Sequence, residues 1–143
     1  MAFAYEERAR QLLVGPPVRT GKLATVGTGG RPHVVPVWYE MDDDGSLIWN
    51  TGEKTVKGRN LARTGWAAIC VDDDRPPFSF VTVEGPVELS TDLDELRHWA
   101  TRIGGRYMGP AVAEAFGARN AVPGELVVRL RPERVLAAFD MAG

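Results

Sequence analysis

The sequence predicts a mainly β protein, a small β-barrel with helices on its periphery. Most apolar segments either alternate with period two or form short runs bounded by turn residues, and only one long segment has strong helical periodicity. The 143 residues include 16 glycines and 10 prolines, which fits a chain with many turns. A chain of this length is expected to bury one core, so we predict a single domain over residues 1–143.

The first half of the chain is predicted to form one helix and an antiparallel meander. A helical pattern over residues 5–14 ends at Gly-Pro-Pro. Strands are predicted over 22–26, 33–41 and 46–51, joined by the turn sequences GTGGRP and DDDG. Pro36 lies inside the second of these strands and has no N–H, so that position should be at a sheet edge or a bulge.

The second half of the chain is predicted to combine further strands with helices. A short polar helix over residues 54–63 stops before Gly65. The strongest helical pattern starts with Thr91 as its cap and ends before the two glycines at 104 and 105, and another helix begins near Pro110. Strands are expected over residues 66–72, 78–89, 125–132 and 134–140.

The charge distribution argues against a nucleic-acid partner. The chain carries 17 lysines and arginines against 19 aspartates and glutamates, which gives a formal net charge of −2. Four bases, Lys54, Lys57, Arg59 and Arg63, lie close together and form a positive island in an acidic background. Such an island suits a compact anion better than a long polyanion.

The chain is expected to be cytoplasmic. Its single cysteine, Cys70, cannot form an intramolecular disulfide, which favours a reducing compartment. The first residues are charged and helix-like rather than typical of a signal peptide, and no apolar stretch is long enough to span a membrane.

Several familiar chemistries lack their residues. The segment TGEKT does not have the spacing of a phosphate-binding P-loop, because Ile48 occupies the position of the first glycine and Glu53 interrupts the Gly-Lys pair. The GTGG turn opens no helix, as a dinucleotide-binding loop would require. His33 and His98 have no cysteine or carboxylate at metal-ligand spacing, so no metal site is predicted.

The basic segment over residues 51–65 is the candidate binding element. The common role of such a charge run is a solvated helix face. Its position after a predicted strand and at the start of a helix favours an anion site, because free backbone N–H groups, the Thr55 hydroxyl, Lys54 and Lys57 can converge there on one phosphate. Arg59 can add a planar pair of donors, and Asn60 can orient the loop or donate a further bond.

Three motifs occur in order between residues 21 and 61. They are GKLAT, GRPHVVPVW and KTVKGRNL. In this combination they resemble the pyridoxamine-phosphate-oxidase-like split β-barrel family, especially its branch of flavin and deazaflavin oxidoreductases that use coenzyme F420. After Leu61 the chain departs from the family's frequent N-L-R-R-D-P, since it continues as Ala-Arg-Thr-Gly.

The resemblance implies a split β-barrel of the FMN-binding type that forms a homodimer with two cofactor sites at the subunit interface. The residues implied at the cofactor phosphate are Lys54, Thr55, Lys57, Arg59 and Asn60. The residues implied around the ring system are Val35, Pro36, Val37 and Trp38, with Asn50 and Thr51 below it.

The reaction implied by the resemblance is hydride transfer between F420 and an unidentified small, conjugated organic substrate. The P-V-W and K-T-x-K-x-R-N-L motifs favour F420, whose tail carboxylates suit nearby bases such as Arg31, Arg63 and Arg75. FMN is the alternative cofactor, because it shares the ring and the phosphate. An alternative function is a non-catalytic protein that binds a flavin, a deazaflavin or a haem.

No catalytic residue is assigned from the sequence, and the lack of an evident one is the feature that favours the non-catalytic alternative. The candidate proton donors are Tyr39, His33 and Tyr107. The candidates for an apolar substrate wall are Trp38, Trp49, Trp66 and Phe78, at least two of which are expected in the core instead.

Overall fold

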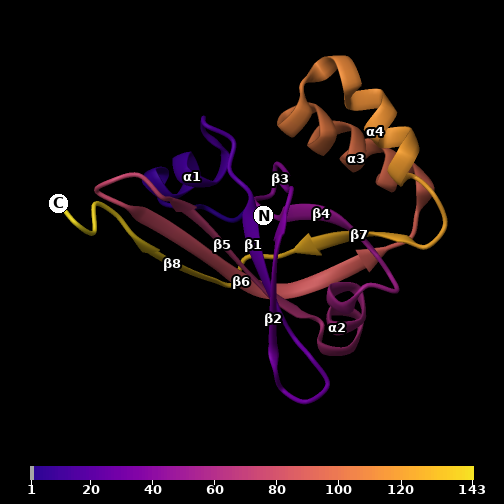
Figure 1. Ribbon diagram of the computed structural model, residues 1–143, viewed down its shortest axis with the longest axis horizontal. Helices are drawn as coiled ribbons and strands as arrows, with labels where there is room; N and C mark the ends of the chain where they lie inside the picture. The colour runs from indigo at the N-terminus through magenta and orange to yellow at the C-terminus, as the bar shows by residue number, and fades with distance from the viewer. Residues whose placement is uncertain (1) are drawn as a thin grey trace.

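The computed structural model describes residues 2–143, which form one curled sheet with helices around it (Figure 1). The strands are β1 (Gly21–Val26), β2 (Pro32–Val37), β3 (Glu40–Met41), β4 (Leu47–Gly52), β5 (Trp66–Asp73), β6 (Ser79–Ser90), β7 (Glu125–Leu130) and β8 (Arg134–Ala138). The helices are α1 (Glu7–Val14), α2 (Val56–Thr64), α3 (Leu93–Met108) and α4 (Ala113–Asn120), with a 3-10 turn, η1 (Pro110–Val112), before α4. Within the described residues, no helix is long and apolar enough to cross a membrane.

The sheet is antiparallel and runs in the order β2-β1-β5-β6-β7-β4-β3. The barrel splits at β6, which pairs with β5 and β8 in its first half and with β7 along Val87–Ser90. Gly85 is required at this crossing, because a Cβ there would lie 2.0 Å from the carbonyl oxygen of Arg131. The fold is therefore the predicted split β-barrel.

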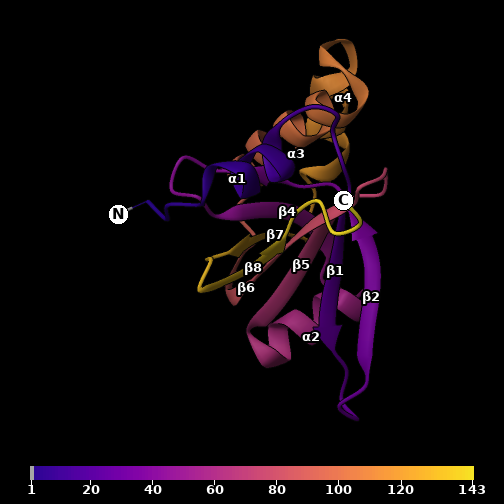
Figure 2. The ribbon, with the colours of Figure 1, turned by 90° about the vertical axis from the view of Figure 1, so that its left-hand side faces the viewer.

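The core divides between the barrel interior and a smaller layer under α3. β4 is buried on both faces, since Leu47 and Trp49 belong to the barrel core, whereas Ile48 packs with Trp99 and Ile103 of α3. Figures 1 and 2 show α3 and α4 on one side of β4 and β7, with α2 on the other side.

The predicted strand over residues 33–41 is two strands in the structure. β2 ends at Val37, whose partner on β1 is Gly21, the first residue of that strand. The chain beyond Val37 has no further partner on β1, so it turns away and pairs with β4 as the short β3. The edge position predicted for Pro36 is confirmed, because β2 ends the strand order.

The strongest predicted helix is longer than expected and has a different cap. Asp92, not Thr91, is the N-cap, and its carboxylate accepts hydrogen bonds from two backbone N–H groups of the first turn at 2.9 and 3.0 Å. The helix also continues through its two glycines to Met108. A Cβ on Gly104 would lie 2.5 Å from the Cβ of Phe116. The glycine pair therefore permits close contact between two helices and does not end the first one.

Candidate functional site

A pocket of about 380 Å³ opens between the ends of β2 and β4 on one side and α3 and α4 on the other. Five of the residues predicted to hold the cofactor line it: Pro36, Val37, Trp38, Asn50 and Lys57. They come from β2 and the residue after it, from β4 and from α2. The fold thus brings the predicted ring residues and one predicted phosphate-binding lysine into a single cavity.

The opposite wall of the pocket was not predicted. It consists of Ala100, Ile103, Gly104, Phe116, Arg119 and Asn120. The apolar members were recognised only as helix faces, and the sequence does not indicate which strands those faces cover. The best available signal is the pair of small residues Gly104 and Gly117 on the two helices, because a Cβ on Gly117 would lie 1.9 Å from Oγ1 of Thr101.

Trp38 is held in the pocket by aromatic neighbours. Its ring stacks on Tyr107 with centroids 5.1 Å apart and an interplanar angle of 3°, and lies 5.6 Å from the ring of Phe116. The Tyr107 hydroxyl donates to the carbonyl of Arg19 at 2.8 Å and accepts from the backbone N–H of Tyr39 at 3.2 Å. These bonds fix the ring on which Trp38 stacks.

None of the three predicted proton donors presents a free donor to the pocket. The Tyr39 hydroxyl donates to the carbonyl of Leu13, and burial raises the pKa of Tyr39 well above its ordinary value. Burial also raises the pKa of Tyr107, whose hydroxyl is bound to backbone. His33 does not line the pocket, and its Nδ1 is buried without a partner among residues 2–143. The catalytic assignment therefore stays empty.

α2 starts directly at the end of β4. Thr55 is its N-cap, with a hydroxyl that accepts from the N–H of Gly58 at 3.1 Å and donates to the carbonyl of Gly52 at 2.7 Å. Gly58 is required because a Cβ there would lie 2.2 Å from that same carbonyl oxygen. The helix ends at Gly65, which has a φ of 66°, as predicted.

The other predicted cofactor residues do not line the pocket. Lys54, Thr55 and Arg59 are exposed around the start of α2. Val35 packs against the barrel core, and Thr51 is buried with its hydroxyl 3.3 Å from that of Thr55.

Asn60 is buried, and its side chain bonds to β1 and to α2. Its amide donates to the Thr25 hydroxyl at 3.1 Å and accepts from Arg63 at 3.3 Å. This geometry favours the orienting role of Asn60 over direct contact with a phosphate.

Two buried polar atoms near the start of α2 have no hydrogen-bond partner within residues 2–143. Nδ2 of Asn50 is one, and Asn50 lines the pocket. Oε2 of Glu125 is the other, on β7 opposite Gly52 of β4. Burial raises the pKa of Glu125, an effect that the positive charge of Lys57 partly offsets. Glu125 was not identified from the sequence, where it reads as an ordinary strand-start residue.

The arginines predicted for a cofactor tail do not line the pocket. Arg75 is held by the carboxylate of Asp73 through bonds of 3.0 and 3.2 Å, and Arg63 donates to the carbonyl of Val26. Arg31 is exposed in the turn before β2. Arg119, which was not predicted, is the arginine that does line the pocket.

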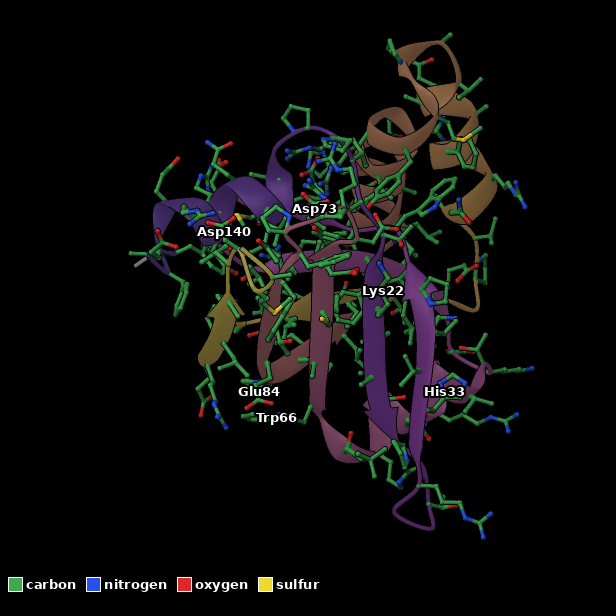
Figure 3. The ribbon with its side chains drawn as sticks, turned by 60° about the vertical axis from the view of Figure 1, so that its left-hand side comes forward. Lys22, His33, Trp66, Asp73, Glu84 and Asp140 are labelled. Carbon is green, nitrogen blue, oxygen red and sulfur yellow. The ribbon has the colours of Figure 1, made fainter. Side chains whose placement is uncertain are left out.

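Only one of the four predicted substrate-wall aromatics, Trp38, lines this pocket. Trp49 is fully buried in the barrel core. Trp66 is exposed at the end of the sheet away from α3 and α4 (Figure 3), and Phe78 borders a different hollow beside α1. At least two of the four were expected in the core. Trp49 is the one that lies there, whereas Trp38 is half-buried.

Comparison with known proteins places the chain in a family. A family model described as pyridoxamine 5'-phosphate oxidase matches residues 6–138. The chain belongs to the pyridoxamine 5'-phosphate oxidase family. The pyridoxine/pyridoxamine 5'-phosphate oxidase of Myxococcus xanthus is 32% identical over 103 residues, which cover 72% of this chain and 49% of that protein.

A second curated relative is a 5a,11a-dehydrotetracycline/5a,11a-dehydrooxytetracycline reductase from Streptomyces rimosus. It is 45% identical over 56 residues, which cover 37% of this chain and 39% of that protein. The present chain thus matches less than half the length of the Myxococcus oxidase and less than half the length of the Streptomyces reductase.

Solved structures confirm the fold of the family. A protein of Mycobacterium tuberculosis superposes with a TM-score of 0.82 at 23% identity, covering 99% of this chain and 88% of its own. A structure described as an F420 reductase has a TM-score of 0.71 at 25% identity, covering 92% and 98%. A heme storage protein of Vibrio cholerae has a TM-score of 0.72 at 17% identity, covering 99% and 100%.

Proposed function

We propose that this protein is an F420-dependent oxidoreductase that transfers a hydride between the deazaflavin ring and a small conjugated substrate. The pocket carries the proposal, because it collects Pro36, Trp38, Asn50 and Lys57 beside the start of α2. The likeness to an F420 reductase over 98% of that protein supports this choice of cofactor. The partial match to a Streptomyces reductase supports reductive chemistry on an organic substrate.

The residues of the pocket fit a flavin-type ring. Nδ2 of Asn50 is a buried donor without a partner within residues 2–143, and a carbonyl oxygen of the ring would satisfy it. β2 is an edge strand, so backbone groups next to Pro36 are available to the polar edge of the ring. Val37 and Trp38 provide an apolar surface against which a planar ring can pack.

The start of α2 fits the cofactor phosphate. The first backbone N–H groups of a helix and its polarity favour a bound anion there. Lys57 is half-buried at the pocket, and the exposed Lys54 and Arg59 can reach the same anion from solvent. Thr55 holds the helix start in place through its bonds to Gly52 and Gly58.

The chemistry of the step comes from the cofactor, and the chain supplies position. When bound, the deazaflavin supplies a two-electron hydride donor, so that one hydride from the reduced ring and one proton together reduce the substrate. Ala100, Ile103 and Phe116 form an apolar wall that excludes water from the face of the substrate. No carboxyl, histidine or tyrosine lines the pocket among residues 2–143, and Lys57 is assigned to the phosphate, so the proton is proposed to come from solvent.

Two alternatives share this pocket. FMN carries the same kind of ring and phosphate, and the family description favours it. A carrier function without turnover is favoured by the engaged state of the two tyrosine hydroxyls, because neither is free to donate a proton to a substrate. The cytoplasmic location stays a prediction that rests on the single cysteine.

We also propose that the protein acts as a homodimer with its cofactor sites at the interface. On the outer face of the sheet, Ala24 lies between Val34 and Ala68 in register. Val34 is 64% exposed and Leu136 on β8 is 52% exposed, and the same face also carries Lys22, Glu84 and Arg134, so it is an accessible face with both apolar and charged residues. Pro36 lies on the same face and borders the pocket, so a partner seated there would also border the pocket.

A titration tests the proposal. F420 and FMN are added separately to the purified protein, and quenching of tryptophan fluorescence reports binding. We expect F420 to bind more tightly than FMN. Reduced F420 is then mixed with a panel of quinones and enones, and its oxidation is followed by absorbance. Tight FMN binding without F420 binding would select the FMN alternative, and binding without oxidation on any acceptor would select the carrier.

A pair of variants tests the phosphate assignment. Lys57→Ala combined with Arg59→Ala should weaken F420 and FMN binding by about tenfold or more, or about 1.4 kcal/mol, because both cofactors carry the phosphate. Arg97→Ala removes an exposed cation of α3 outside the pocket and should leave both affinities unchanged. A double variant that binds within about threefold of the natural protein would show that the phosphate lies elsewhere.

A further inference from the structure

We propose that Arg119 binds an anionic group of the substrate, and that the substrate is therefore a planar conjugated acid. The proposal rests on the function proposed above, since it concerns the half of the same pocket that faces the cofactor ring. It adds the chemical class of the substrate and the side chain that selects it.

The charged residues that line the pocket are all positive among residues 2–143. Lys57 and Arg119 are its two cationic lining residues, and no carboxylate lines it within the part of the chain that the structure describes. Arg119 belongs to none of the ion pairs found among residues 2–143. Arg106, by contrast, donates to the carbonyls of Tyr39 and Leu13 at 2.5 and 2.9 Å. The charge of Arg119 is thus available to a ligand.

The two cations come from opposite walls. Lys57 is on α2 and Arg119 is on α4, and these helices lie on opposite sides of β4 and β7 in Figures 1 and 2. The tail of F420 continues from its phosphate, so a cofactor phosphate at the start of α2 places the tail carboxylates on that side as well. Arg119 is left facing the other end of the pocket, where the substrate must bind.

The neighbours of Arg119 specify a flat ligand. Its guanidinium lies 5.9 Å from the ring centroid of Phe116, which in turn lies 5.6 Å from the ring of Trp38. The side-chain amide of Asn120 donates a hydrogen bond to the carbonyl of Phe116 at 2.9 Å. A conjugated ligand can therefore pack on the ring of Phe116 while its carboxylate receives paired hydrogen bonds from the planar guanidinium.

A matched pair of probes tests this reading. 3-Benzoylacrylate is a planar conjugated acid, and its methyl ester has the same shape without the charge. Each is titrated into the protein loaded with whichever cofactor binds, with tryptophan fluorescence as the readout. The natural protein should prefer the acid by about tenfold or more, because the ester cannot pair with the guanidinium.

Three variants complete the test. Arg119→Ala should weaken acid binding by about tenfold and change ester binding by less than about threefold. Arg119→Lys keeps the charge without the planar fork and should retain part of the preference. Arg97→Ala, a cation on α3 outside the pocket, should leave both probes unaffected. Circular dichroism checks that each variant is folded.

Several outcomes overturn the proposal. The proposal is wrong if the natural protein binds the acid no more tightly than the ester, or if it binds neither probe. It is also wrong if Arg119→Ala weakens binding of the acid and of the ester equally. If Arg119→Ala instead weakens F420 binding and spares FMN, the arginine binds the cofactor tail and the proposal is wrong. Failure of both cofactors to bind the natural protein would sink the proposed function itself. Unchanged cofactor binding without acid preference overturns only the assignment of Arg119.

Discussion

The two walls of the pocket differ in the groups that they offer to a ligand. The wall of β2, β4 and α2 offers backbone groups of an edge strand and of a helix start, together with the side chains of Trp38, Asn50 and Lys57. The wall of α3 and α4 offers the side chains of Ile103, Phe116 and Arg119. Backbone groups cannot be changed by substitution, whereas side chains can. A fixed cofactor therefore suits the first wall, and a substrate that differs among relatives suits the second.

The walls also differ in how closely their parts approach. At the first wall, Gly58 meets the backbone oxygen of Gly52, which the end of β4 holds in place. At the second wall, Gly104 meets the Cβ of Phe116, which can move only together with the exposed helix α4. The first wall should therefore tolerate less change than the second, and one added methyl group on each measures the difference.

Gly58→Ala is expected to have the largest effect. Alanine favours a helix over glycine by about 1 kcal/mol, but its Cβ would lie 2.2 Å from the Gly52 oxygen, so the helix start must move away from β4. Overpacking against fixed atoms costs about 3 kcal/mol, which exceeds the helix gain. Denaturant unfolding should show a net loss of about 2 kcal/mol, and cofactor affinity should fall with it.

Gly29→Ala is the matched control for that substitution. Gly29 lies in the turn before β2, and a Cβ there would meet no atom within 4 Å. Its stability and cofactor affinity should match those of the natural protein. A Gly58→Ala variant as stable as Gly29→Ala would mean that α2 can shift freely, and the first wall would not be the rigid one.

Gly104→Ala is expected to have a smaller and different effect. Its Cβ would lie 2.5 Å from the Cβ of Phe116, but Phe116 and α4 can move outward because α4 is largely exposed. The net loss of stability should be about 1 kcal/mol, measured by the same unfolding experiment. Binding of the conjugated acid should weaken while cofactor binding stays unchanged. A larger loss of cofactor affinity than in Gly58→Ala would reverse the roles of the two walls.

The first wall was predictable from the sequence because its parts are close along the chain. Pro36 and Trp38 lie on or next to one strand, Asn50 on the next long strand, and Lys57 at the helix that follows. Pro36 and Lys57 have local physical reasons to be there, the missing N–H of a proline at a strand edge and a base at a helix start, whereas Trp38 and Asn50 were implied by the family resemblance. Strand periodicity and turns are local signals and predicted a small β-barrel with peripheral helices, and the family resemblance specified that the barrel is split.

The second wall was not predictable, because it depends on contacts between distant segments. The two glycines of α3 resemble a helix end unless Phe116 is known to lie against Gly104. Arg119 near the end of a short helix has an ordinary role there, since cations favour helix C-termini. Nothing local indicates that it lines a pocket. Unpartnered atoms such as Nδ2 of Asn50 are likewise visible only after the strands pair.

Glu125→Gln gives the smallest expected effect and tests the electrostatics of the first wall. Burial raises the pKa of Glu125 from its ordinary value of 4.5, so the folded protein keeps a proton that the unfolded chain has already released. The natural protein should therefore lose stability as the pH rises from about 4.5 to the raised pKa, whereas the glutamine variant should not. Below that window the two proteins should respond alike to pH.

Urea unfolding at several pH values between about 4 and 8 measures this difference. The stability of Glu125→Gln relative to the natural protein should grow through the window and then level off, and Glu114→Gln on the exposed surface of α4 serves as the control. The side chain of Glu125 lies near Lys57, so the same variant should also bind the cofactor phosphate more tightly above the window, where a nearby negative charge has been removed. A difference that does not change with pH would mean that water or Lys57 satisfies the carboxylate. Glu125 would then be ionised at every pH tested and would compete with the cofactor phosphate for Lys57 throughout that range.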